Sequence, residues 1–176
     1  MSGDLDTVIA RCDDPGVKAQ LKRLTAYVDY VYLCEATGET YSWFCRTYPD
    51  APLRMKSIYK VFDGGLLFDI TLLAHDTTDG NLIVRRPGFR KIDAPFVKKD
   101  LGMPEKFRIF ALTCYGNLYC FTDGSEEIIE WSVPERKITA RYANAAIWLG
   151  SEIKEAESLI SEGLLTPRAA NLEQKE

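Results

Sequence analysis

The sequence predicts an α+β fold in which an antiparallel meander sheet is flanked by N-terminal helices and a long C-terminal helix. Three apolar, β-prone runs lie between Phe107 and Val133, separated by Tyr115-Gly116-Asn117 and Asp123-Gly124-Ser125. Glycine supplies the positive φ that tight hairpin turns require, so we expect these runs to form successive hairpins. Helical spacing of apolar residues precedes and follows this stretch, which is typical of helices and strands that are segregated along the chain.

Length and composition predict one globular domain. The 176-residue chain is long enough to bury about 70% of its unfolded surface in a single core. A hydrophobic share of 46% and a charged share of 27% are typical of ordinary globular domains. Because neither an internal repeat nor a linker is visible, we expect one domain over residues 1–166 and a disordered polar tail over residues 167–176.

Charge and cysteine content narrow the expected partners and compartment. The formal net charge of -4 argues against a general polyanion binder, because affinity for nucleic acid rests mainly on Lys and Arg at phosphates. Five cysteines without a C-x-x-C pair, and an N-terminus without a basic and apolar leader, indicate free thiols in a reducing cytoplasm. No apolar run approaches the ~20 residues of a membrane span, so we expect no membrane association.

The N-terminal part of the chain has helical periodicity. Asp13-Asp14-Pro15 is a helix start signal, because proline is tolerated at the first helical position and carboxylates suit a helix N-terminus. An apolar stripe then predicts a helix of about five turns that ends at Thr37-Gly38. The residues of this stripe are Val17, Leu21, Leu24, Val28 and Val31. A short helix capped by Thr40 is expected to follow, running to Tyr48 with Trp43 and Phe44 buried.

Another helix is expected after the double-proline break at Pro49 to Pro52. Its apolar spacing begins at Leu53 and reaches Phe62. Asp63-Gly64-Gly65 is expected to stop it, because glycine is the preferred residue of a left-handed cap. The apolar run from Leu66 to Leu73 then suits one buried strand, with a buried helical turn as the alternative.

The C-terminal half contains the meander and its closing helix. Before it, residues 75–106 are expected to be mostly loop, with one short helix near Phe96 to Leu101. Apolar residues on both faces of the meander suggest a sheet that is covered on each side for part of its width. A fourth strand is expected from Lys137 to Arg141. Asn144 is expected to cap the final helix and Gly163 to end it.

A set of short motifs runs through the chain from near Tyr41 to Glu162. It begins with Pro52-Leu53, the aromatic run from Ile58 to Phe62, Asp63-Gly64-Gly65 and an apolar strand. This order is similar to the "LP…Y..F…NGG" element of the SUKH superfamily, the Smi/Knr-type proteins. Later stretches resemble that family's "IG…GD-ICLD" hairpin, its "V..WDH" strand and its closing "W.SFEEFL" helix; they are Ile109 to Phe121, Ile128 to Trp131, and Tyr142 to Ile153.

The resemblance implies a protein-binding domain without chemistry of its own. Bacterial SUKH members are largely immunity proteins, which neutralise a co-encoded toxin domain, often a nuclease or deaminase, by direct contact. Fungal members act in signalling and cell-wall regulation through protein partners. We therefore expect an immunity protein, with a scaffold or regulatory module of the same fold as the alternative. The family has no shared catalytic residues, so the resemblance transfers a class of function and no site.

No catalytic, metal or cofactor site is expected from the residues themselves. A Cys–His nucleophile needs a base beside the thiolate, and the single histidine, His75, lies in a polar segment. The thiols that it could meet are those of Cys34, Cys45, Cys114 and Cys120, and buried structural cysteines are commoner than reactive ones. His75, Asp76 and Asp79 suit a solvated turn better than a metal site. A small hydrolase remains the enzymatic alternative.

Acidic residues gather around the second predicted hairpin turn and the strand after it. They are Asp123, Glu126, Glu127, Glu130 and Glu135, while Tyr115 and Asn117 mark the tip of the first hairpin. Acidic groups near exposed aromatics suit capture of a basic toxin surface. A solvated sheet edge, where charges discourage aggregation, is the alternative. The candidate partner-binding residues are therefore Tyr115, Asn117, Asp123, Glu126, Glu127 and Glu130.

A basic cluster supports a rival hypothesis. Its members are Arg85, Arg86, Arg90 and Lys91, and they would suit a weak nucleic-acid contact. The chain is acidic as a whole and contains no nucleic-acid recognition motif, which disfavours this interpretation.

Overall fold

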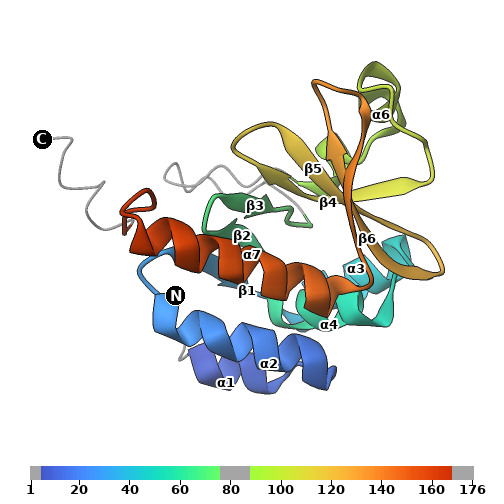
Figure 1. Cartoon of the computed structure of the whole chain (residues 1–176). Coiled ribbons are helices and arrows are strands. Elements are labelled where there is room, and N and C mark those ends of the chain that lie inside the picture. Colours follow the sequence, from blue (N-terminus) through green and yellow to red (C-terminus); the bar gives the residue numbers. More distant parts are fainter. Residues whose placement is uncertain (1–4, 76–87, 168–176) are drawn as a thin grey trace, which may run out of the picture.

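The computed structural model describes residues 5–75 and 88–167, and within them a seven-stranded antiparallel sheet runs through the molecule in chain order, as a meander (Figure 1). The strands are β1 (Val31–Glu35), β2 (Phe62–Leu67), β3 (Ile70–Leu72), β4 (Phe107–Thr113), β5 (Asn117–Thr122), β6 (Ser125–Ser132) and β7 (Lys137–Tyr142). The predicted α+β class, with helices before the meander and a long helix after it, is confirmed.

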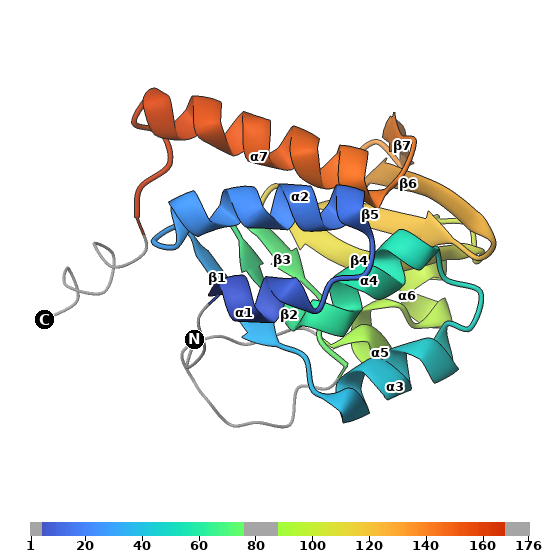
Figure 2. The same cartoon turned by 90° about the horizontal axis from the view of Figure 1, so that it is seen from below.

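Helices from both ends of the chain lie together beside the sheet. The helices before β2 are α1 (Leu5–Ala10), α2 (Pro15–Arg23), α3 (Gly38–Thr47) and α4 (Leu53–Val61), and the closing helix is α7 (Ala145–Ser161). Figures 1 and 2 show α7 and α2 running side by side, with α1 next to α2. Two short helices, α5 (Phe89–Ile92) and α6 (Pro95–Asp100), precede β4, and α5 packs against that strand.

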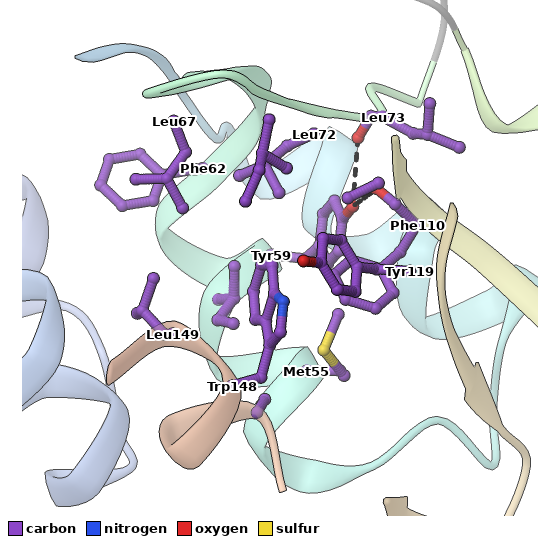
Figure 3. Close-up of a cluster of buried hydrophobic side chains, with 14 of the residues drawn as sticks. Met55, Tyr59, Phe62, Leu67, Leu72, Leu73, Phe110, Tyr119, Trp148 and Leu149 are labelled. Carbon is purple, nitrogen blue, oxygen red and sulfur yellow. Dashed lines mark hydrogen bonds between the residues drawn. The ribbon is translucent and has the colours of Figure 1, made fainter. Parts of the chain in front are cut away.

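Aromatic side chains from several elements meet in the core between the helices and the sheet (Figure 3). Trp148 of α7 stands edge-on to Phe110 of β4, with ring centroids 5.0 Å apart. Tyr59 of α4 is buried beside them and stacks on Phe44, at 4.3 Å between centroids. The Tyr59 hydroxyl lies 3.2 Å from the carbonyl oxygens of Leu73 and Phe110, so a buried donor joins α4 to the sheet.

Most boundaries predicted for the C-terminal half are confirmed. The expected short helix near Phe96 to Leu101 is α6, and the expected fourth strand of the meander is β7. Asn144 caps α7, because its side-chain oxygen accepts from the amides of two first-turn residues. Gly163 follows the helix with φ 72°, the left-handed conformation expected there. The tail after Pro167 lies outside the described residues.

The helix predicted from Pro15 to Thr37-Gly38 is wrong in its second half. α2 ends at Arg23, a short 3-10 helix (Leu24–Tyr27) follows, and the chain then enters β1. In β1, Val31 and Leu33 are buried while Tyr32 between them is exposed, which is the period of a strand. Val31 fits the helical stripe and the strand alternation equally well, so the local pattern extended the helix too far.

Thr37 begins α3 and does not end a preceding helix. The Thr37 hydroxyl accepts from the Thr40 amide, and the Thr40 hydroxyl accepts from the Thr37 amide, so the two form a capping box. The predicted cap at Thr40 is therefore one turn too late. Of the two aromatics expected to be buried in this helix, Phe44 is buried and Trp43 is half-buried.

Asp63-Gly64-Gly65 lies inside β2 and does not cap α4. The helix ends at Val61, and Phe62 is already extended. Gly65 has φ 128°, and a Cβ there would lie 2.3 Å from the carbonyl oxygen of Tyr32 in β1. The close approach of the two strands therefore requires glycine at this position.

The run from Leu66 to Leu73, predicted as one strand, is a hairpin. β2 ends at Leu67 and β3 begins at Ile70, with Phe68 between them at φ 56°. Phe68 is 3% exposed and packs edge-on against Tyr27, at 6.0 Å between ring centroids. Burial of the Phe68 side chain stabilises an otherwise unfavourable backbone conformation. Because this turn contains no glycine, the local sequence does not predict it.

Replacing Gly65 with Ala tests the contact between β1 and β2. We expect Gly65→Ala to lower the free energy of unfolding by about 3 kcal/mol or more, because the new methyl group meets backbone atoms. Gly116→Ala is the matched control, since Gly116 also has positive φ but no atom lies within 4 Å of the added Cβ, and it should cost about 1 kcal/mol. Urea unfolding measures both, and equal losses would contradict the steric explanation.

Candidate functional site

The predicted acidic residues of the β5–β6 hairpin are already paired within the chain. Asp123 lies 2.8 Å from Arg108, Glu126 lies 3.3 Å from Arg54, and Glu127 lies 2.6 Å from Arg141. Glu126 also accepts from the first amide of α4, and the Gly124 amide in the turn donates to the Asp50 carbonyl oxygen at 2.8 Å. This hairpin is therefore docked on the loop before α4, and its carboxylates are balanced by neighbouring cations.

The tip of the first hairpin is different, because it projects an aromatic side chain into solvent. Tyr115, between β4 and β5, is 76% exposed. Asn117 begins β5 and donates from Nδ2 to Glu130 Oε1 over 2.6 Å. Asp69, in the β2–β3 turn, lies beside the exposed Cys114, with 3.8 Å between Oδ2 and Sγ. The meander thus brings residues of two turns and of β6 to one end of the sheet.

α7 adds an acidic residue to this end of the sheet. Glu155 is exposed and contributes to a raised pKa of the Tyr115 hydroxyl. The main causes of this shift are the charge interaction and hydrogen bond with Cys114, and Asp69 and Glu155 contribute less. We call the whole group the tip surface; its residues are Asp69, Cys114, Tyr115, Asn117, Glu130 and Glu155. Within residues 5–75 and 88–167, its three carboxylates form no ion pair with Lys or Arg, in contrast to those of the β5–β6 hairpin.

Beneath the tip surface, α7 places one carboxyl group in the core. Glu152 is 7% exposed and accepts a 2.8 Å hydrogen bond from the Tyr119 hydroxyl of β5. Burial raises the pKa of Glu152 to about 7, although the Tyr119 hydrogen bond opposes the shift. Nearby carboxylates add to it, in the order Glu155, Asp69 and Glu130.

Glu152 is not among the predicted site residues, although its position in the helix indicates burial. Glu152 lies four residues after Trp148 and four before Ala156, so it occupies the apolar stripe of α7. An acid at such a position is buried or paired when the helix packs.

A second buried polar cluster fixes the segment of α5 and α6 to β4. Lys98 Nζ lies 2.8 Å from Asp93 Oδ1, and the two side chains are 2% and 6% exposed. Asp93 also accepts from the Ile109 amide at 2.9 Å and from the Tyr48 hydroxyl at 3.0 Å. Since β3 pairs only with residues 111–113 of β4, Asp93 provides at Ile109 the acceptor that a neighbouring strand would otherwise supply.

His75 is held by a carboxylate. Its Nδ1 lies 2.8 Å from Asp63 Oδ2, and its backbone amide donates to the other oxygen at 2.8 Å. The ring packs edge-on against Trp43, at 5.8 Å between centroids. Asp76 and Asp79, for which a solvated turn is predicted in preference to a metal site, lie outside the described residues. In the part of the chain that the structure describes, no group of three or more His, Cys, Asp or Glu residues could hold a metal ion.

The thiols considered for a nucleophile differ in exposure. Cys120 is fully buried, and burial raises its pKa well above the ordinary value, which makes it a poor nucleophile. Cys114 is exposed, and its contacts are with Asp69 and Tyr115 in the tip surface. Cys34 and Cys45 are partly buried. Of the basic cluster, Arg85 and Arg86 lie outside the described residues, and Lys91 on α5 is exposed.

Comparison with known proteins gives no family for this chain. No protein-family model matches the sequence, and no curated protein matches it. Across the described ranges, none of the helices has the length and apolar character needed to cross a bilayer. A functional conclusion therefore depends on the chemistry of the tip surface and on the motifs in the sequence.

Removing one member of the buried Asp93–Lys98 pair tests its structural role. We expect Asp93→Ala to lower the free energy of unfolding by about 3–5 kcal/mol, because it leaves a buried ammonium without a charged partner. The double variant Asp93→Ala/Lys98→Met should regain part of this loss. Glu127→Ala breaks an exposed ion pair and should cost less than about 1 kcal/mol. Thermal or urea unfolding measures all three, and a small loss for Asp93→Ala would refute the anchoring role.

Proposed function

We propose that this chain is a non-catalytic protein-binding domain, and specifically an immunity protein that neutralises a toxin domain by direct contact. The observation that carries the proposal is the tip surface, where an exposed Tyr115 lies near the carboxylates of Asp69 and Glu155, which have no cationic partner in the described chain. Tyrosine is among the residues that contribute most to protein interfaces, because it buries a large rigid area and keeps a polar end.

The charge of the tip surface defines the expected partner. A toxin that cuts or deaminates nucleic acid must bind a polyanion, so its active face carries Lys and Arg. Asp69 and Glu155 provide the opposite charge near Tyr115, and Glu130 adds to it beside Asn117. Complementary potentials accelerate association and disfavour wrong partners. A domain that covers the basic face of such a toxin also blocks its substrate, so no chemistry is required for neutralisation.

The motifs that resemble the SUKH superfamily support the same proposal. They lie on α4, β2, the β4–β5 hairpin, β6 and α7, which belong to one sheet and its helical cover. No disulfide joins any of the five cysteines, all of which lie in the described residues, and this suits action in a reducing cytoplasm. The proposed partner is therefore a cytoplasmic toxin domain with a basic face.

Toxin rescue and binding measurements test the function. The toxin domain encoded next to this chain's gene should form a complex with it in isothermal titration calorimetry, and co-expression should restore growth. Complex formation without rescue, or several partners without a toxic neighbour, would favour the scaffold alternative. Turnover of a substrate that is lost in Cys114→Ala or His75→Ala would instead favour the hydrolase.

Tyr115→Ala tests the surface itself. We expect it to weaken toxin binding by about 30-fold, which corresponds to the roughly 2 kcal/mol of an interface hot spot. Phe96→Ala is the matched control, because Phe96 is a similarly exposed aromatic, at 67%, on α6. Phe96→Ala should change affinity less than about 2-fold. Unfolding curves equal to those of the parent must accompany both variants, and equal affinities for the two would contradict the assignment of the tip surface.

A further inference from the structure

Glu152 faces acidic and phenolic groups from several elements that lie near the middle of α7. They are Tyr119 of β5, Glu130 of β6, Tyr142 of β7, Asp69 of the β2–β3 turn and Glu155 of α7 itself. The rings of Tyr119 and Tyr142 lie 6.3 Å apart, and burial raises the pKa of Tyr142 to about 12. Both phenols are therefore neutral at physiological pH, and no member of this group can balance a carboxylate.

The cations on the helices that pack against α7 are engaged elsewhere or face solvent. On α2, Lys18 donates to the Ala10 carbonyl, Lys22 is exposed and Arg23 pairs with Glu157. On α4, Arg54 pairs with Asp14 and Glu126. Lys56 of the same helix donates to the Pro49 carbonyl, and Lys60 pairs with Asp13. An ionised Glu152 would thus be a buried charge with the Tyr119 hydroxyl as its hydrogen-bond donor. Such surroundings favour the neutral acid.

We propose that the protonated form of Glu152 holds α7 on the sheet and that loss of this proton loosens the helix, so that the docking of α7 is sensitive to pH. The geometry supports this, because Glu152 lies in the middle of the buried stripe of α7, between Trp148 and Ala156. The inference concerns the fold and does not rest on the proposed function.

The direction of the effect follows from proton linkage. The pKa of Glu152 is about 7 in the folded chain, against an ordinary value of 4.5 in the unfolded chain. Between these values the folded state binds more protons, so its stability is full below about pH 4.5, falls as pH rises toward 7 and becomes constant above. The opening constant of α7 should therefore increase by on the order of 50-fold from pH 5 to pH 8.

Carbon-13 NMR of the side-chain carboxyl groups tests the protonation directly in the parent chain. The Glu152 carboxyl signal should titrate with a midpoint near 7, and Glu155→Gln should move this midpoint to lower pH by removing a neighbouring charge. A midpoint near the ordinary 4.5 in the intact chain would overturn the proposal. This measurement does not depend on whether a Glu152 variant folds.

Hydrogen exchange resolved along α7 tests the consequence. After correction for intrinsic exchange rates, the opening constant of α7 should rise with pH in the parent chain and stay flat in Glu152→Gln, whose neutral amide still accepts from Tyr119. Glu162→Gln is the control, because Glu162 is an exposed acid that follows α7, and it should keep the parent response. The same pH response in Glu152→Gln and in the parent would overturn the proposal.

Discussion

Burial on both faces of β5 is the constraint from which the rest of the structure follows. Tyr119, Cys120 and Phe121 are consecutive residues of one strand and all three are buried. Neighbouring side chains of a strand point to opposite faces, so a run of this kind requires cover on both sides of the sheet. Trp148 of α7 packs on Tyr119, while Asp93 and Lys98 of the α5–α6 segment lie close enough to influence the pKa of Cys120. The seven strands are stable as a meander because both covers are present.

With both faces of the sheet covered, some ionisable side chains are buried, and their surroundings differ. Lys98 has an oppositely charged partner in Asp93, which lies 2.8 Å away and also accepts from the Ile109 amide. Glu152 has acids and phenols around it, so neutralisation by a proton is the less costly state. The contrast explains why the Asp93–Lys98 pair anchors the α5–α6 segment, whereas Glu152 makes the docking of α7 depend on pH.

The sequence predicted the parts of the fold that local chemistry determines. Glycine turns and apolar runs are sufficient to predict β4 to β6, and Asn144 and Gly163 to predict the ends of α7. It failed where distant contacts decide the conformation. Gly65 is required by β1, far earlier in the chain, and Phe68 turns at positive φ because its side chain is buried against Tyr27. For the proposed tip surface, the predicted hairpins and the acidic cluster indicate Tyr115, Asn117 and Glu130 as candidates, but only the fold brings Asp69 and Glu155 to the same end of the sheet and pairs Asp123 with Arg108.

The contact between α7 and α2 has a consequence for the order in which the chain assembles during translation. Arg23 and Glu157 are 134 positions apart and meet at 2.8 Å. At ribosomal speeds of about 5–20 residues per second, α2 waits on the order of ten seconds for its partner helix. Until then the apolar side of α2 lacks its cover, and the rings of Phe110 and Tyr119 lack their contact with Trp148. The incomplete chain therefore exposes apolar surface that a chaperone would bind over this interval.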